Sequence, residues 1–165
     1  MRGTGQYWKV DFLLLADALG RREQAQGVLD SIAQEASERG STLEPTTTVS
    51  LLRRNGDKLR VFGPLSFAGS VVADLGLARP DTQRFTDDVS QGISSENLDV
   101  ADGDWLFYGV QGGDETELTG EPLWDGLTAV AAGRAVEVDD DTFFLNAGPT
   151  AARTVLDQVA SSLSA

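Results

Sequence analysis

Arginine and carboxylate side chains are the groups in this sequence that could bind or transform a ligand, because the chain has no histidine and no cysteine. A thiolate nucleophile, an iron–sulfur cluster and a cysteine zinc site are therefore excluded, and the usual general base is missing. No two carboxylates stand out as a pair for acid–base catalysis. The sequence thus offers few residues for enzymatic chemistry.

Arg53 is the strongest candidate for a ligand contact. Together with Arg54 it ends a run of β-branched and aliphatic residues just before a turn. Side chains alternate faces along a strand, so the two arginines point to opposite sides and one of them can project above the sheet edge. A guanidinium in that place would pair bidentately with a carboxylate, catecholate or hydroxamate oxygen. An ordinary surface charge is the alternative interpretation, and it has equal weight.

A glycine-containing loop from Gly63 to Ser70 precedes a predicted helix. Free amides and the macrodipole at a helix start favour an anion. The loop has neither the lysine of a P-loop nor the spacing of a dinucleotide fingerprint. The favoured interpretation is a strand-to-helix connection that needs glycine and a cap at Ser66. The alternative is that its backbone and Phe67 form part of a ligand cleft.

Aromatic side chains gather near the predicted strand ends, at Phe62, Phe67, Tyr108, Trp124, Phe143 and Phe144. Trp124 is interpreted as core. Phe143 and Phe144 cannot both face inward in an extended segment, so one of them is expected to be exposed in a cleft or an interface. The preceding Asp139-Asp140-Asp141 run lacks the glycine and the distant glutamate of a calcium loop. It is therefore predicted to be a solvated turn, and no metal site is expected.

An alternation of helices and strands must position these residues. Helices are predicted at residues 11–19, 21–36, 66–75, 121–132 and 148–163 from the 3.6-residue spacing of apolar side chains and from glycine or proline at their ends. Strands are predicted at residues 46–52, 59–62, 105–110 and 135–138, and Asn55-Gly56 between the first two indicates a hairpin. Residues 78–93 are predicted as loop, followed by one helical turn from Ser94. The pattern is typical of a layered α/β domain with a mostly parallel sheet.

Length and charge narrow the possible partners. A chain of 165 residues fits one domain with a proper core. Its 26 acids against 13 bases give a net charge of −13, which argues against nucleic acid and anionic membranes as partners. The apolar run Phe12 to Ala16 is much shorter than the roughly 20 residues that a membrane span needs, and no secretory leader precedes it.

A series of segments carries a resemblance to a known family: Ala18-Leu19-Gly20-Arg21, Val49-Ser50-Leu51-Leu52-Arg53, Arg60-Val61-Phe62-Gly63-Pro64, Val72-Ala73-Asp74-Leu75-Gly76, Ile93-Ser94-Ser95-Glu96-Asn97-Leu98, Asp104-Trp105-Leu106-Phe107, Pro122-Leu123-Trp124, Gly133-Arg134-Ala135-Val136 and Gly148-Pro149-Thr150-Ala151-Ala152. In order and spacing they resemble the C-terminal lobe of the helical-backbone (class III) solute-binding proteins that deliver ferric siderophores, haem or cobalamin to ABC transporters. The resemblance covers the chain from about Asp11 onward, although no single motif is specific.

This resemblance implies a three-layer αβα sandwich with a mostly parallel sheet and one β-hairpin, as a single lobe of a two-lobed periplasmic-binding-protein fold. Residues 1–20 would be the end of the interlobe connecting helix with an N-terminal extension, and residues 21–165 the ligand-binding lobe. The implied function is that of the substrate-binding component of an ABC importer. It would hold a ferric siderophore or a related iron chelate between two lobes, with no catalysis and no cofactor.

The resemblance also implies roles for individual residues. Arg53 would neutralise ligand oxygens, and the cleft would be lined by Phe62, Ser66, Phe67, Tyr108 and Phe143 or Phe144. Glu96 would dock on an arginine of the transporter permease. A carboxylate that merely stabilises the first turn of a helix is an equally good interpretation of Glu96.

Compared with a complete member, we expect this chain to hold one lobe, without the signal peptide and the lipid-anchor cysteine. We expect the full-length parent to be extracytoplasmic, either periplasmic or a cell-surface lipoprotein. Half a cleft supplies half the contacts, so tight binding would need the missing N-terminal lobe or self-association.

A function from another class remains as an alternative: a free-standing small α/β enzyme or regulatory domain acting on a phosphorylated small molecule. The loop from Gly63 to Ser70 and the surplus of acids motivate it. The lack of histidine, cysteine and a P-loop lysine argues against it.

Overall fold

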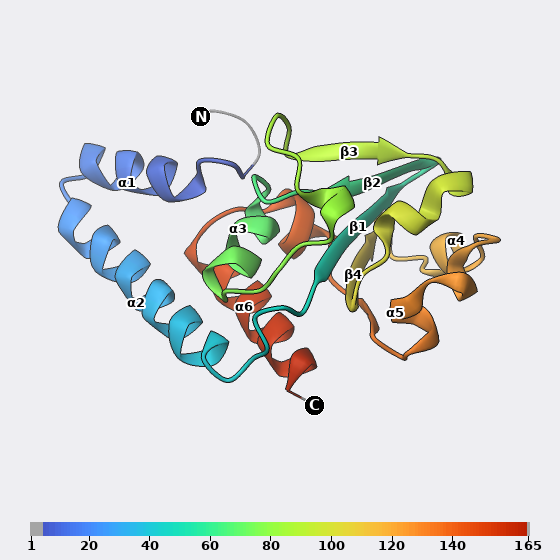
Figure 1. Ribbon diagram of the computed structural model, residues 1–165. Helices are drawn as coiled ribbons and strands as arrows, with labels where there is room; N and C mark the ends of the chain where they lie inside the picture. The colour runs from blue at the N-terminus through green and yellow to red at the C-terminus, as the bar shows by residue number, and fades with distance from the viewer. Residues whose placement is uncertain (1–4, 165) are drawn as a thin grey trace.

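The predicted hairpin supplies two strands of a five-stranded sheet (Figure 1). The computed structural model describes residues 5–164. Strand β1 (Val49–Asn55) pairs antiparallel with β2 (Lys58–Phe62), and Asn55 lies opposite Lys58. The turn therefore consists of Gly56 and Asp57, one residue later than predicted. Gly56 has a φ of 56°, a left-handed conformation that glycine adopts without a steric penalty.

The strands on the other side of β1 pair parallel. Strand β4 (Trp105–Val110) pairs parallel with β1, and β5 (Ala135–Glu137) pairs parallel with β4. The strand order is β3-β2-β1-β4-β5, and β2 alone runs against the other four. The carboxyl ends of β1, β3, β4 and β5 therefore share one edge of the sheet. The prediction of a mostly parallel sheet with one hairpin is confirmed.

Edge strand β3 (Ser90–Ile93) corrects the prediction that residues 78–93 are loop. Its polar and glycine-containing sequence has little strand propensity of its own. It is held by antiparallel pairing with β2 and by Arg60, whose guanidinium donates to the Ser90 carbonyl (2.9 Å). Pairing with a distant segment thus decides its structure. The 3-10 helix η1 (Asp81–Gln83) lies earlier in the same region.

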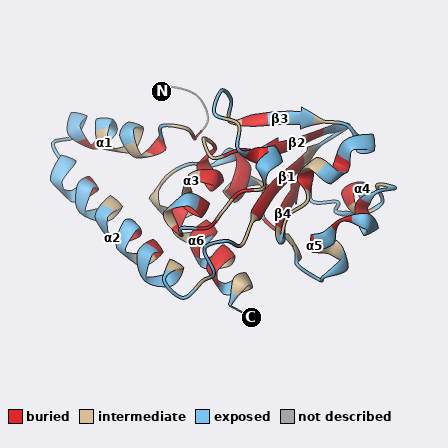
Figure 2. Cartoon of the chain, in the orientation of Figure 1, coloured by how far each residue is buried: buried red, intermediate tan, exposed pale blue. Residues whose placement is uncertain are grey.

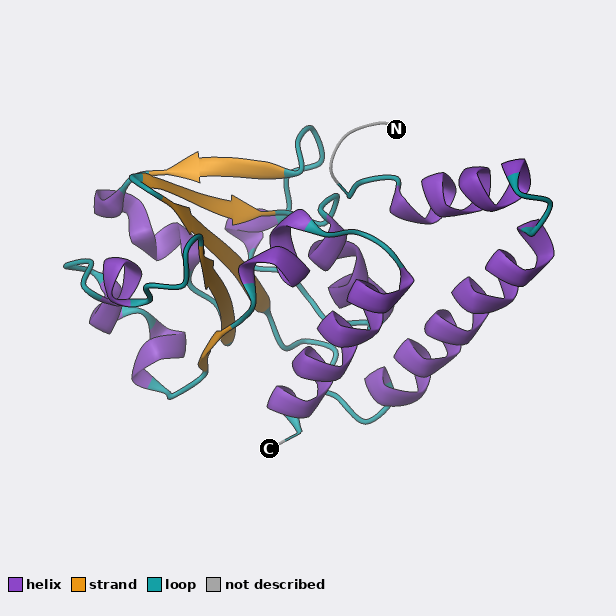
Figure 3. Ribbon diagram, turned by 180° about the vertical axis from the view of Figure 1, so that it is seen from behind, coloured by secondary structure: helices purple, strands orange, loops and turns teal. Residues whose placement is uncertain are grey.

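One face of the sheet is covered by the long helices (Figures 1 and 3). Helices α3 (Phe67–Asp74) and α6 (Pro149–Leu163) pack on it, and α2 (Arg22–Gly40) packs against both of them. Helix α1 (Trp8–Ala18) forms a hairpin with α2 and contacts α3 through its buried Trp8. The buried side chains of this layer include Ile32, Leu51, Val72, Phe107 and Val155. Figure 2 shows that the outer sides of α1 and α2 are largely exposed.

The other face is covered by short elements: η2 (Ser95–Ala101), α4 (Thr116–Thr119), η3 (Trp124–Gly126) and α5 (Thr128–Ala131). They enclose a second core that includes Leu52, Val61, Leu98, Leu106 and Leu118. The two cores on either side of one sheet confirm the predicted three-layer αβα architecture.

The predicted helix at residues 121–132 is wrong in its extent. Leu127 is extended (φ −70°, ψ 136°), and the α-helix starts only at Thr128. The Asp102 carboxylate accepts hydrogen bonds from the amides of Thr128 (2.8 Å) and Ala129 (3.1 Å), which fixes the helix start there. Trp124 is buried, as predicted.

The predicted boundary between residues 20 and 21 falls in the turn between α1 and α2, where Gly20 has a φ of 66°. Residues 1–4 of the first predicted part and residue 165 of the second lie outside the described residues. The division into an interlobe segment and a lobe stays a prediction.

Candidate functional site

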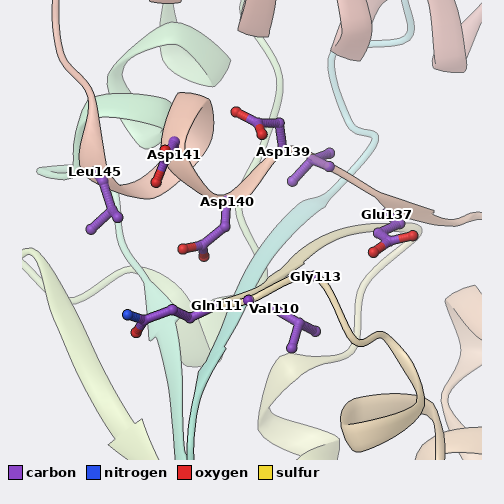
Figure 4. Close-up of a pocket in the computed structure, with 10 residues that line it drawn as sticks. Val110, Gln111, Gly113, Glu137, Asp139, Asp140, Asp141 and Leu145 are labelled. Atoms are coloured by element: carbon purple, nitrogen blue, oxygen red, sulfur yellow. The ribbon is translucent and has the colours of Figure 1, made fainter.

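A hollow of about 510 Å³ opens at the edge of the sheet where the parallel strands end (Figure 4). It is lined by residues 110–113, which include the last residue of β4, by residues 137–141, which include the last residue of β5, and by Leu145. In open α/β sheets, ligands bind outside the carboxyl ends of the strands, at the point where the strand order reverses. Here the order reverses between β1 and β4. The hollow is therefore the candidate ligand site of this domain.

Arg53, the predicted ligand contact, lies near the end of β1 and is not among the residues that line the hollow, but it is bound to Asp140, which is. The Arg53 Nε atom donates to Asp140 Oδ1 at 2.6 Å and an Nη atom donates to Oδ2 at 2.7 Å. The two side chains are only 10% and 11% exposed. The hydrogen bonds that Arg53 donates to Asp140 raise the pKa of Arg53 above its ordinary value, against the opposite effect of burial.

Gly109 leaves room for this pairing. It lies beside Arg53 in the register of β1 and β4. A Cβ at position 109 would come within 3.2 Å of Asp140 Oδ1 and 2.8 Å of the Phe144 ring. The missing side chain leaves the space in which Asp140 reaches Arg53.

Arg54 points to the opposite face of β1, as the strand alternation predicts. It pairs with Glu121 and, at 3.6 Å, with Glu117. Arg54 therefore takes no part in the candidate site.

Most of the aromatic candidates converge beside the hollow. A pocket of about 20 Å³ is lined by Phe62, Ser66, Phe67, Phe143 and Phe144, with Leu145 shared between this pocket and the larger hollow. The Phe62 and Phe144 rings lie 4.8 Å apart, and Phe143 stacks at 6.2 Å on Phe107. This volume has room for about one water molecule, whereas small-molecule pockets measure about 300–1,000 Å³, so these residues form a packed wall and not a cavity for a chelate.

The expectation that Phe143 or Phe144 is exposed is wrong. Both are buried, at 1% and 8% exposure. The segment is not extended but forms a single π-helical turn, η4 (Asp141–Leu145), so neighbouring side chains can both point to the core. The exposed apolar side chain is Leu145, at 47%.

Ser66 acts as the cap of α3. Its Oγ donates to the Gly63 carbonyl (2.7 Å) and accepts from the Gly69 amide (3.0 Å), and the side chain is buried. These contacts support the strand-to-helix interpretation of the loop from Gly63 to Ser70. The capped amide is already satisfied without an anion.

Tyr108 is not brought together with the other candidates. In β4 the Phe107 side chain points to the layer of α3 and α6, so Tyr108 points to the opposite layer. Its ring lies 4.9 Å from Trp124, and its hydroxyl donates to Glu115 at 3.3 Å. Burial, together with the charges of Glu115 and Glu137, raises the pKa of Tyr108 to about 12.

The acidic run from Asp139 to Asp141 is only partly the solvated turn that was predicted. Asp139 and Asp141 are exposed, whereas Asp140 is withdrawn into the pair with Arg53. Asp139 accepts from the amide (2.8 Å) and hydroxyl (2.5 Å) of Thr142, and these bonds lower the pKa of Asp139. Among residues 5–164, no three acidic side chains are grouped so that they could hold a metal ion.

Glu96, the predicted docking residue, is exposed in η2. This helix follows Ile93, which ends β3 opposite Leu59 at the same edge of the sheet as the hollow. Glu96 therefore lies in the first turn of a helix that begins at the edge on which the candidate site opens.

Sequence reasoning missed Asp140 as the partner of Arg53, and it missed Gln111 and Leu145 as lining residues. Gln111 directly follows a parallel strand, which is a signal available in the sequence. The contact of Asp140 with Arg53 joins residues 87 positions apart and has no such signal.

The sequence profile of the family described as "Periplasmic binding protein" matches residues 2–142, which is most of the chain. The chain belongs to the periplasmic binding protein family. The resemblance drawn from the sequence is thereby confirmed at the level of the family.

Two curated relatives are each 29% identical to the chain. One is the Bacillus subtilis (strain 168) protein named "Probable siderophore-binding lipoprotein YfiY", where the match covers 92% of this chain and 52% of the relative. The other is the "Achromobactin-binding periplasmic protein" of Dickeya dadantii (strain 3937), where it covers 90% and 54%. The chain thus spans about half the length of these relatives, both of which are named as binding proteins and not as enzymes.

Solved structures share the fold. FhuD2 from Staphylococcus aureus, determined with bound ferrioxamine B, matches with a TM-score of 0.85 at 17% identity, over 98% of this chain and 65% of that one. BSU3320 from Bacillus subtilis, described as a component of a Fep/Fec-like ferrichrome ABC transporter, matches with a TM-score of 0.83 at 23% identity, over 95% and 61%. Within residues 5–164, no helix has both the length and the apolar composition to cross a membrane.

Proposed function

We propose that this chain is the C-terminal, ligand-binding lobe of the solute-binding component of an ABC importer for ferric siderophores or related iron chelates. The observation that carries the proposal is a hollow at the carboxyl edge of the sheet that is lined by Gln111, Asp140 and Leu145, with Arg53 bound to Asp140 beneath its lining. The family membership and the names of the two curated relatives point in the same direction.

The lobe would supply one wall of the binding site. The hollow is open, and a wall of this kind buries only part of a chelate, whereas pockets for small molecules bury most of the ligand surface. We therefore infer that a second lobe closes over this edge in the complete protein. The isolated chain should bind weakly.

Docking on the permease is a further part of the proposal. Glu96 is exposed and follows the edge that carries the hollow, so a permease arginine could reach it while the ligand faces the same side. Since the curated relatives are named as a lipoprotein and a periplasmic protein, we propose an extracytoplasmic location for the complete protein.

The test is a titration of the 165-residue protein with ferric hydroxamate and ferric catecholate siderophores, followed by tryptophan fluorescence. Two matched variants locate the site. Leu145→Ala removes an apolar side chain at the hollow that is 47% exposed, and Leu123→Ala removes one on the other layer that is 43% exposed. We expect Leu145→Ala to weaken binding severalfold and Leu123→Ala to leave it unchanged. Equal effects of the two variants, or no binding of any chelate by the unchanged protein, would contradict the proposal.

A further inference from the structure

The charges around the hollow specify the class of chelate, on the basis of the proposed function. An iron chelate can carry a positive, zero or negative net charge, depending on the groups that surround its iron-binding oxygens. A binding wall discriminates among these by the unpaired charges that it presents, because like charges that approach each other without a counter-ion are disfavoured.

Arg53 does not present an unpaired positive charge. Two of its guanidinium nitrogen atoms are bound by the two carboxylate oxygens of Asp140, and both side chains are about nine-tenths buried. Arg53 is also absent from the residues that line the hollow, whereas Asp140 is present. The pair is held in a fixed place, because Gly109 leaves room for Asp140 and η4 follows it directly. An anionic ligand would therefore have to displace a buried internal counter-ion.

The remaining ionisable groups of the hollow are all carboxylates. Glu137, Asp139 and Asp141 are exposed at its rim, and Figure 4 shows Glu137 apart from Asp140 across the hollow. With Arg53 and Asp140 cancelling each other, this wall carries an excess of negative charge. The whole chain adds to it, with a net charge of −13. Such a field attracts cations and repels anions over a distance set by the ionic strength.

We infer that the ligand of this lobe is a ferric chelate of neutral or positive charge, such as a hydroxamate chelate with a protonated amine, and that Asp140 excludes anionic chelates by occupying Arg53. Asp140 is thus a specificity-determining residue. Without Asp140, the guanidinium of Arg53 would be free to bind the carboxylate of a ligand.

Three probes with one iron-binding core test the inference. Ferrioxamine B carries a net charge of +1 through its free amine, its N-acetyl derivative is neutral, and its N-succinyl derivative carries −1. At low salt, we expect the 165-residue protein to bind the cationic ferrioxamine B at least about tenfold more tightly than the anionic N-succinyl derivative. The ratio should shrink as salt screens the rim charges. Binding of the anionic probe as tightly as the cationic one would overturn the inference and leave the proposed function intact. Failure of all three probes to bind, while another ferric chelate binds, would overturn the inference alone. Failure of every ferric hydroxamate and catecholate to bind would overturn the proposed function as well.

Variants assign the effect to residues. Asp140→Asn frees Arg53 and should raise the affinity for the N-succinyl probe relative to the cationic one by about tenfold. The same substitution at the exposed Asp125, on the other layer, should leave the ratio unchanged.

Because Asp140→Asn leaves a buried guanidinium without its partner, it can impair folding. The double variant Glu137→Gln and Asp141→Asn removes two exposed rim charges and leaves the buried pair intact. It should reduce the discrimination between the probes severalfold. A double variant that discriminates as strongly as the unchanged protein would overturn the role of the rim charges and with it the inference.

Discussion

Gly69 lets helix α3 start against the end of strand β2, and replacing it by alanine should destabilise the protein. A Cβ at position 69 would lie 2.1 Å from the carbonyl oxygen of Gly63 and 2.7 Å from Ser66 Oγ. Neither group can move freely. The Gly63 amide donates to the carbonyl of Val89 (3.0 Å), and Ser66 Oγ bonds both to the Gly63 carbonyl and to the Gly69 amide.

Two contributions lower the free energy of unfolding of Gly69→Ala, and one raises it. Forcing an extra methyl group into a packed site costs about 1–3 kcal/mol. Loss of the serine cap adds about 1 kcal/mol. The better helix propensity of alanine returns about 1 kcal/mol. We therefore expect Gly69→Ala to lower the free energy of unfolding by about 1–3 kcal/mol, and to displace Ser66 and Phe67 beside the candidate site.

Gly27 provides the matched control. It lies inside α2, is exposed, and has no heavy atom within 4 Å of a Cβ built on it. Gly27→Ala should therefore raise the free energy of unfolding by about 0.5–1 kcal/mol.

Urea denaturation followed by circular dichroism measures both variants. With a slope of about 2 kcal/mol per M, a loss of about 2 kcal/mol moves the midpoint down by about 1 M, while Gly27→Ala moves it up. A Gly69→Ala variant that is as stable as Gly27→Ala would refute the reasoning, because it would mean that the close approach to Gly63 imposes no steric constraint.

Two further predictions concern the core and the acid stability. Phe143→Ala should lower the free energy of unfolding by about 3–5 kcal/mol, because the ring is 1% exposed and stacks on Phe107. Leu145→Ala, two residues further along the chain, should change it by no more than about 0.5 kcal/mol. Equal losses of the two variants in urea denaturation would contradict this prediction. The amide and hydroxyl of Thr48 bond to Asp104 (2.8 and 2.7 Å) and lower its pKa, so the stability from this ionised carboxylate is present above the unfolded pKa of about 4 and is lost as the pH falls through the folded pKa. Asp104→Asn should therefore be less stable than the unchanged protein at pH 7, and the difference should shrink as the pH falls below the unfolded pKa of about 4; a difference independent of pH would count against this.

Local signals account for the parts of the fold that the sequence predicted. The hairpin of β1 and β2, the buried strand β4 and the terminal helix α6 each follow from apolar spacing and turn residues within a short window. The edge strand β3 and the broken helix near residue 127 carry no such signal. Their structures depend on pairing with β2 and on the Asp102 carboxylate, both outside the segment concerned.

In the candidate site, too, local patterns predict some features, whereas others depend on distant contacts. The alternation along β1 predicts that Arg53 and Arg54 face opposite layers, and the structure confirms it. The alternation along β4 likewise separates Phe107 from Tyr108, but it does not say which of the two shares a layer with Arg53. That choice depends on which helices pack on which face.

The sequence by itself thus determined the family, the layered α/β architecture and the arginine at the end of the first strand, because these features are encoded in residue order, spacing and periodicity. The tertiary structure decided what that arginine can do. Asp140 reaches Arg53 because β1 and the turn after β5 meet at one edge of the sheet, where Gly109 leaves room for the carboxylate. Contacts between residues so far apart depend on the arrangement of the whole sheet, and no local pattern encodes them.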